Sequence, residues 1–196
     1  MTTTKTVKFM AHIQVPEGVP GIRSLVMYRP DTGEHLYALA QALLRNESPL
    51  SEAERELIAT FVSSLNNCNF CAGSHAAAAR FLFGSDKKLV DQVIADYQTA
   101  PVSDKLKALL TIARHVQQDA RTVSDELVAE ARRQGANDRD IHDTVLIAAT
   151  FCLFNRYVDG LATLTPDPSA YEAMGERMGT IGYVMPHVSA PVDSSK

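Results

Sequence analysis

The sequence predicts a single all-α domain, and three observations support this fold class. Apolar residues recur every three or four positions along most of the 196-residue chain, which is the period of an amphipathic helix. Residues typical of helix starts and stops flank these stretches. The alternating apolar pattern of a strand is absent beyond the first thirty residues. Since 45% of the residues are hydrophobic, the chain can form one core without disulfides or metals.

Capping residues and helix breakers define the predicted helices in turn. Helix starts are indicated by N-cap residues or a capping box, namely Asp31 with Thr32, Ser51 with Glu54, Asp86, Ser103, Ser124 and Asn137. Helix ends are indicated by Pro, Gly or Asn, namely Pro49, Asn66 with Asn67, Gly84, Gly135 and Pro166. The expected helices are residues 33–46, 51–65, 69–82, 86 to at least 94, 103–121, 124–134, 137–162 and a short one at 171–177.

The helix expected over residues 137–162 is apolar on nearly all sides at its centre, which is typical of a buried helix. We therefore expect it to be the central core element. The domain divides into an N-terminal arm (1–30), a helical core (31–165) and a C-terminal tail (166–196) that is rich in Gly, Pro, Ser and Met. The apolar arm and the Met-bearing tail are candidates for subunit contacts.

Composition and charge exclude several classes of partner. The net charge is −4, and no basic run is interleaved with aromatic residues, so we expect no nucleic-acid partner. The longest apolar run is too short to span a bilayer, and the first residues lack the apolar stretch of a signal peptide. We therefore expect a cytoplasmic protein without a membrane partner, and we assign no cofactor and no metal.

Two of the three cysteines form a C-x-x-C pair, Cys68 and Cys71. In a reducing cytosol a close pair indicates redox catalysis or metal binding more often than a structural disulfide. The third cysteine, Cys152, lies within an apolar stretch and is expected to be a small buried core residue. The chemistry is therefore expected at the pair.

The spacing of the pair and of His75 predicts a redox-competent arrangement on one helix. Cysteines at positions i and i+3 have Cα atoms roughly 5 Å apart, within the range that a disulfide permits. His75 follows Cys71 by four residues, and because helical side chains lean toward the N-terminus, its imidazole is directed back over the Cys71 sulfur. The free N–H groups at the helix start are expected to lower the thiol pKa.

A carboxylate, Glu56, joins this site only if the chain folds back on itself. On one continuous helix Glu56 and His75 would be roughly 28 Å apart. A reversal at Asn66 and Asn67 places them at nearly the same level of a helical hairpin. The carboxylate would then hold the imidazole tautomer and support proton transfer.

These residues also resemble a known motif. Eleven residues separate Glu56 from Cys68, two separate Cys68 from Cys71, and three separate Cys71 from His75. This spacing resembles that of the alkylhydroperoxidase D and carboxymuconolactone decarboxylase superfamily. The flanking segments are similar to the subgroup called peroxidase-related enzymes, over roughly residues 20–165. The resemblance is specific because four chemically distinct positions agree within an all-helical context.

The resemblance implies a function and a role for each residue. Cys71 is the peroxidatic cysteine, Cys68 resolves it into a disulfide, and His75 and Glu56 form the proton relay. A peroxide is the substrate, an external dithiol is the reductant, and the family's helical fold implies a homo-oligomer, commonly a trimer or hexamer. One departure concerns Phe70, because alkylhydroperoxidase D has a histidine just before the second cysteine.

Three alternatives remain open at the sequence level. The four site residues could bind zinc, although structural zinc sites usually have a second Cys or His pair. The decarboxylase chemistry of the wider superfamily has no use for a C-x-x-C pair. The pair could also be a redox sensor without turnover. Asn155 and Arg156, in an otherwise apolar helix, are either pocket or interface residues or partners in a buried hydrogen bond.

Overall fold

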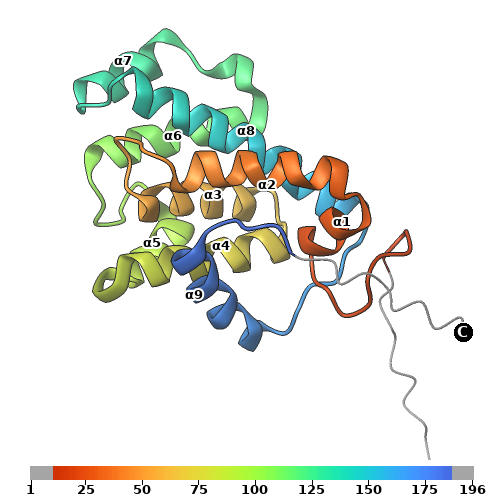
Figure 1. Cartoon of the computed structure of the whole chain (residues 1–196). Helices are drawn as coiled ribbons and strands as arrows, with labels where there is room; N and C mark the ends of the chain where they lie inside the picture. The colour runs from red at the N-terminus through yellow and green to blue at the C-terminus, as the bar shows by residue number, and fades with distance from the viewer. Residues whose placement is uncertain (1–10, 187–196) are drawn as a thin grey trace, which may run out of the picture.

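The computed structural model describes residues 11–186 as a bundle of α-helices, and that part of the chain contains no strand (Figure 1). The predicted all-α class is thus confirmed. The helices are α1 (Ile22–Tyr28), α2 (Pro30–Arg45), α3 (Glu52–Leu65), α4 (Asn69–Phe83), α5 (Lys88–Asp96), α6 (Asp104–Asp119), α7 (Asp125–Arg133), α8 (Asp138–Gly160) and α9 (Tyr171–Ile181), with short 3-10 turns η1 (Gly84–Asp86), η2 (Ala120–Thr122) and η3 (Pro168–Ala170). None of the helices among the described residues has the length and apolar character needed to cross a membrane.

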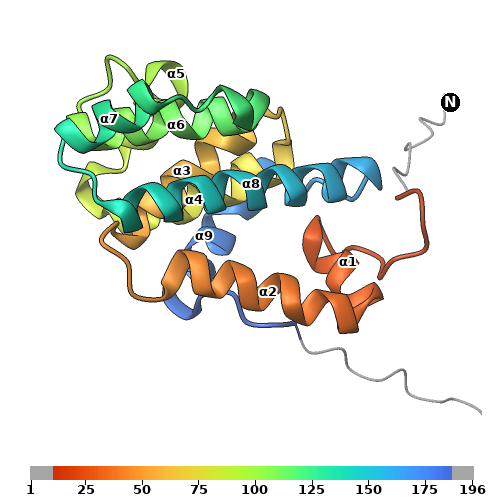
Figure 2. The same ribbon diagram turned by 90° about the horizontal axis from the view of Figure 1, so that it is seen from above.

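Two helices form the centre of the bundle. The long helix α8 crosses the molecule and packs on α1, α2, α3, α4 and α6, as Figure 2 shows from above. Helix α3 packs on α2, α4, α5, α6 and α8, and all but its two ends are buried. The sequence predicts a central role for α8. The structure adds α3, on which the charged residues Arg55 and Glu56 are buried.

Helices α3 and α4 form the predicted hairpin. The side chain of Ser51 accepts a hydrogen bond from the Glu54 backbone N–H, and Glu54 completes the capping box. At the other end of α3, Asn67 adopts a left-handed conformation (φ 57°), which asparagine tolerates better than most residues. The backbone N–H of Cys68 then bonds to the Ser63 carbonyl. This closed helix end reverses the chain within a few residues.

The segment expected as an N-terminal arm contains a helix. Leu25 and Val26 of α1 are buried within the same chain, so they belong to the core and are not free for subunit contacts. Helix α2 begins at Pro30 and not at residue 33, because proline at the first helical position needs no N–H partner. The helix expected to open at residue 86 begins two residues later, after η1.

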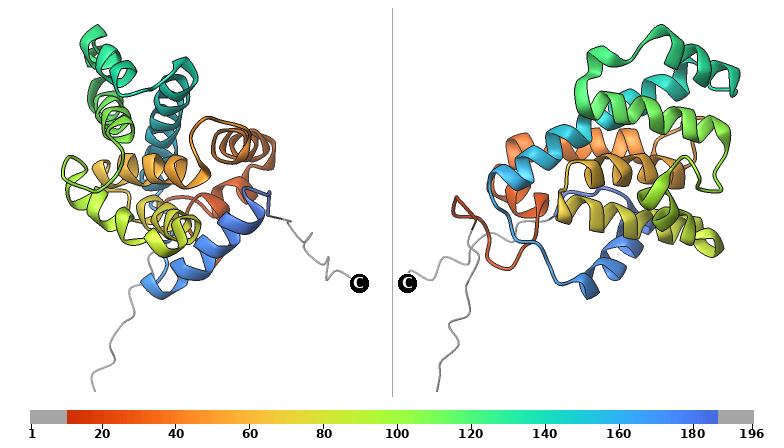
Figure 3. Two further views of the ribbon diagram at one scale, coloured as in Figure 1. Left: turned by 90° about the vertical axis from the view of Figure 1, so that its left-hand side faces the viewer. Right: turned by 180° about the vertical axis from the view of Figure 1, so that it is seen from behind.

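The tail is also more ordered than expected. Helix α9 extends to Ile181, four residues beyond the predicted helix, and lies alongside α4 (Figures 1 and 3). The contact is close because Gly175 presents no side chain to the α4 backbone at Ala77. Residues 166–186 are therefore part of the folded unit, and residues 187–196 lie outside the described residues.

Candidate active site

A buried carboxylate and an imidazole meet across the hairpin. Glu56 of α3 is fully buried, and its Oε2 lies 2.7 Å from Nδ1 of His75 on α4. The fold-back proposed from the sequence is thereby confirmed. Because the carboxylate accepts a hydrogen bond at Nδ1, the ring proton lies on Nδ1, and Nε2 can accept a proton from another group.

The other carboxylate oxygen of Glu56, Oε1, has two partners that the sequence does not reveal. Nη2 of Arg45, at the end of α2, lies 2.6 Å from Glu56 Oε1, and the hydroxyl of Tyr183, after α9, lies 2.5 Å from the same atom. The Tyr183 hydroxyl also lies 3.2 Å from His75 Nδ1. Three further segments of the chain, at Arg45, His75 and Tyr183, thus meet at the carboxylate carried by α3.

These contacts determine the ionisation of the site. Burial alone raises the pKa of Glu56, but the charge and hydrogen bonds of His75, Arg45 and Tyr183 outweigh it, so the pKa is lowered. Burial and the Glu56 charge raise the pKa of Tyr183 well above its ordinary value. The carboxylate is therefore ionised at neutral pH, and the phenol stays protonated and donates.

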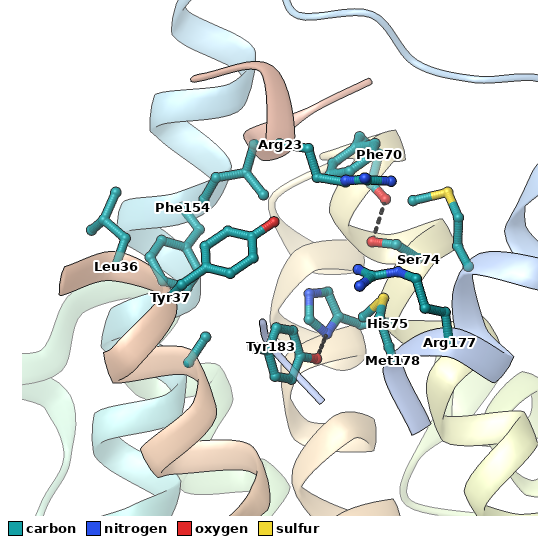
Figure 4. A pocket seen from close by; sticks show the side chains of 13 residues that line it. Arg23, Leu36, Tyr37, Phe70, Ser74, His75, Phe154, Arg177, Met178 and Tyr183 are labelled. Atoms are coloured by element: carbon teal, nitrogen blue, oxygen red, sulfur yellow. Dashed lines mark hydrogen bonds between the residues drawn. The ribbon is translucent and has the colours of Figure 1, made fainter. Parts of the chain in front are cut away.

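The imidazole is held in one orientation. The edge of the Phe151 ring packs against it at a centroid distance of 4.5 Å, and the Tyr183 ring stacks at 5.9 Å. Figure 4 shows the second ring nitrogen of His75 turned away from Tyr183, toward the side of Tyr37 and Arg23. A base whose tautomer and direction are both held in this way suits proton transfer.

The two cysteines lie at the start of α4. Cys68 is the N-cap residue and is fully buried, and Cys71 is 3% exposed. Both pack with Phe70 and Val158 in a small cluster separate from the main core. The predicted C-x-x-C pair is thus present, with both thiols free and shielded from solvent.

The expected lowering of the thiol pKa is wrong for Cys71. Hydrogen bonding with Cys68 and burial raise the pKa of Cys71 well above its ordinary value, and a hydrogen bond from Asn155 opposes this only in part. The N–H groups of the first turn are outweighed because two buried thiols share one site and cannot both ionise readily. Cys71 is therefore a protonated thiol at neutral pH.

The four predicted residues form two pairs. The ring contacts of His75 are with Glu56, Tyr183 and Phe151, and a hydrogen bond from His75 to the Cys71 sulfur is not among those of residues 11–186. The direct imidazole–sulfur contact stays a prediction. No group of three or more His, Cys, Asp or Glu side chains in this range is arranged to hold a metal ion, so the arrangement does not favour the zinc alternative.

A cavity of about 50 Å³ adjoins the imidazole, which is room for a few water molecules or a small ligand group. Its floor includes His75 and Ser74, and most of its wall is apolar (Figure 4). Phe70 and Met174 contact both this cavity and the cysteine cluster. A single layer of side chains thus separates the cavity from the two sulfurs.

Fold and site together define an all-helical protein with a buried cysteine pair on the same helix as a carboxylate-bound histidine. Residues 30–114 match the model of the Carboxymuconolactone decarboxylase family. No curated protein matches the chain. The matching solved structures described next extend the likeness to most of the chain.

One is the crystal structure of an uncharacterized peroxidase-related protein from Ralstonia eutropha JMP134, described as an alkylhydroperoxidase AhpD core. It is 26% identical in sequence, with a TM-score of 0.74, and the match covers 85% of this chain and 96% of that chain. An uncharacterized peroxidase-related protein from Silicibacter sp. TM1040 has 25% identity and a TM-score of 0.75 over 89% and 100%. A protein of unknown function from Agrobacterium tumefaciens, at 20% identity and a TM-score of 0.64 over 73% and 96%, shares the fold. The family match and the two peroxidase-related relatives support assignment of the chain to the alkylhydroperoxidase D and carboxymuconolactone decarboxylase superfamily.

Proposed function

We propose that the protein is a thiol-dependent peroxidase that reduces organic hydroperoxides or hydrogen peroxide. The observation that carries this proposal is a C-x-x-C pair on the same helix as a histidine whose Nδ1 is held by a buried, ionised carboxylate. The peroxidase-related names of two solved relatives support it. Cys71 is the nucleophile, Cys68 the resolving cysteine, and His75 and Glu56 the proton relay.

The raised pKa of Cys71 makes base assistance necessary. His75 Nε2 accepts the thiol proton, and the Glu56 carboxylate stabilises the resulting imidazolium. The sulfur attacks the O–O bond of the hydroperoxide, and that bond breaks. The alkoxide leaves and takes the proton from His75, which yields an alcohol and a Cys71 sulfenic acid.

The second half of the cycle uses Cys68. Its thiol condenses with the sulfenic acid of Cys71, which releases water and forms a disulfide. The first-turn geometry permits this bond without refolding of α4. An external dithiol then reduces the disulfide by thiol–disulfide exchange and is itself oxidised. We propose a homo-oligomer, a trimer or hexamer, as the assembly in which this occurs.

A turnover assay tests the proposal. Wild type should consume cumene hydroperoxide in the presence of a dithiol, and Cys71→Ser should abolish consumption. Cys68→Ser should retain the first step, seen as a sulfenic acid that a dimedone-type reagent traps on Cys71. Cys152→Ser, which changes the partly buried third cysteine, is the matched control and should retain the wild-type rate. Full activity of Cys71→Ser would show that the nucleophile is assigned wrongly.

One observation favours a second candidate, a redox sensor without turnover. The cysteines are buried behind Phe70 and do not line the cavity, and this slows access of both peroxide and reductant. A sensor should form the disulfide reversibly but show no repeated consumption of peroxide with excess dithiol. Measured turnover above one equivalent per site distinguishes the enzyme.

A further inference from the structure

Two arginines line the cavity above His75 without forming ion pairs. Arg23 comes from α1 and Arg177 from α9, and both are partly buried. Among the described residues neither guanidinium has an ion-pair or side-chain hydrogen-bond partner. Figure 4 shows both guanidinium groups on the same side of the cavity, near Phe70 and Ser74. Arg45, by contrast, is paired with the Glu56 carboxylate.

A buried phenol lies in the same cavity wall. Tyr37 of α2 is 6% exposed, and its hydroxyl has no hydrogen-bond partner within residues 11–186. Burial raises the pKa of Tyr37, while the charges of Arg23 and Arg177 lower it, so both cations act on this one side chain. The hydroxyl is not among the fully buried side-chain atoms that lack a partner, so it is open to a ligand or water in the cavity.

The cavity lacks any negative charge that could neutralise the two arginines. None of its lining residues is Asp or Glu. The Glu56 carboxylate, which holds the cavity residue His75, already accepts bonds from Arg45, Tyr183 and His75. The Ser74 hydroxyl is likewise engaged, because it bonds to the Phe70 carbonyl at 2.9 Å. Positive charge and one free phenol therefore remain for a ligand.

We infer that this cavity binds the carboxylate of an organic hydroperoxide, so that the preferred substrate is anionic. Arg23, Arg177 and Tyr37 bind the carboxylate, since guanidinium groups match its two oxygens. The apolar wall holds the alkyl part, and the peroxide group lies against Phe70 and Met174, the side chains between the cavity and the two sulfurs. The assignment of the ligand as a substrate rests on the proposed peroxidase function, whereas the carboxylate site itself does not.

A binding measurement tests the site without turnover. The non-reactive acid 4-methylpentanoate should bind to wild type in calorimetry, and the neutral amide 4-methylpentanamide should bind more weakly. Arg177→Met should weaken binding of the acid by about 10- to 100-fold and leave the amide unchanged. Arg121→Met removes a surface arginine that pairs locally with Asp119 and serves as the control. Arg23→Met provides an independent variant if Arg177→Met does not fold.

A kinetic measurement tests the substrate class. The acid 4-hydroperoxy-4-methylpentanoate should have a lower KM than its methyl ester. Arg177→Met should remove this difference, whereas the surface control Arg121→Met should keep it. Equal KM values for acid and ester, together with no binding of 4-methylpentanoate, would overturn the inference but leave the peroxidase proposal intact. Binding of the acid without consumption of either peroxide would support the carboxylate site, overturn its assignment to a substrate and count against the peroxidase.

Discussion

Tyr183 lies 127 positions from Glu56 in the chain, yet its hydroxyl donates to the same carboxylate that holds His75. It touches no reacting atom in the proposed cycle, so it is a positioning residue. Tyr183→Phe should lower kcat by about 10-fold, less than the roughly 10²- to 10⁴-fold effect of losing a general base. The stability loss should be about 1.5–3 kcal/mol, because a hydrogen bond to a charged group is removed.

The pH profile separates positioning from simple destabilisation. The Tyr183 bond is one of the contacts that lower the pKa of Glu56, so without it Glu56 takes up a proton at a higher pH. The acid limb of the kcat profile should therefore move to higher pH in Tyr183→Phe. Tyr97→Phe also loses a hydroxyl contact, with Thr111 at 3.3 Å, and should leave the profile unchanged. An unmoved acid limb in Tyr183→Phe would count against a positioning role.

At the level of single residues, the sequence could predict what local spacing determines. Cys68 and Cys71 lie at the start of one helix with His75 further along it, and a single reversal pairs Glu56 with His75, so periodicity was sufficient to predict these two pairs. Tyr183 could not be found in this way, because only the docking of α9 brings it to the site. The same holds for Arg23 of α1 and for Tyr37 and Arg45 of α2, which reach the cavity or the site only through tertiary packing.

The same reasoning failed for the ionisation of Cys71. A helix N-terminus is visible in the sequence and lowers a thiol pKa, but burial and a second thiol act in the opposite direction and depend on tertiary packing. Asn155 illustrates the same limit, because the sequence is consistent with either a pocket residue or a buried hydrogen-bond partner at this position. In the structure it bonds to Ser63 and Asn66 and also acts on Cys71.

Among the elements, the helices of the core were predictable, whereas α9 was predicted only in part, as residues 171–177. Capping residues are local signals, so the starts of α3, α7 and α8 follow directly from Ser51, Ser124 and Asn137. The segment of α9 is rich in Gly and Met, which suggests a tail. Its glycines instead permit a close approach to α4, and this can be judged only when both helices are in place.

Substitution of Gly175 tests this contact. A Cβ at this position would lie 2.4 Å from the Ala77 backbone carbonyl carbon, and backbone cannot move aside as a flexible side chain can. Gly175→Ala should therefore destabilise the protein by about 1–3 kcal/mol, as overpacking does, despite the better helix propensity of alanine. Because Tyr183 follows α9 directly, peroxidase activity should fall as well. Urea unfolding and the turnover assay measure the two effects.

The matched control lies at the end of α8. The Cβ of an alanine at Gly160 would meet no packed neighbour within 4 Å. Gly160→Ala should therefore be neutral or slightly stabilising. If Gly175→Ala proved as stable and active as Gly160→Ala, the close packing of α9 on α4 would not be needed to place Tyr183. The comparison of the two variants separates the effect of the α4–α9 contact from the general effect of replacing a helical glycine.

For the whole molecule, one buried charge cluster links folding to pH. Glu56 is fully buried with Arg45 and His75, and its lowered pKa means that the unfolded chain binds a proton more readily than the folded chain. The stabilisation from Glu56 is therefore fully present above its ordinary pKa of 4.5 and is lost as the pH falls through the lower folded value. In that interval the stability changes by about 1.4 kcal/mol per pH unit for this group.

Glu56→Gln should remove this pH dependence and destabilise the protein at neutral pH. The loss at pH 7 should be about 3–5 kcal/mol, because Arg45 stays buried without its charged partner. The difference from wild type should shrink as the pH falls below 4.5, since wild type then loses the same interaction. Urea unfolding at pH 7, 5 and 4 measures it, at one fixed chain concentration because association shifts apparent stability.

A surface carboxylate provides the comparison for this last measurement. The pKa of Glu130 is also lowered, by hydrogen bonds from Gln134 and Arg133, but the group is solvent-exposed. Glu130→Gln should therefore leave the pH dependence of unfolding nearly unchanged, because exposed pairs contribute little. If Glu56→Gln and Glu130→Gln gave the same curve, acid sensitivity would arise from surface charge in general. If only Glu56→Gln loses the pH dependence of unfolding, the acid sensitivity arises in the buried cluster that orients the proposed catalytic base.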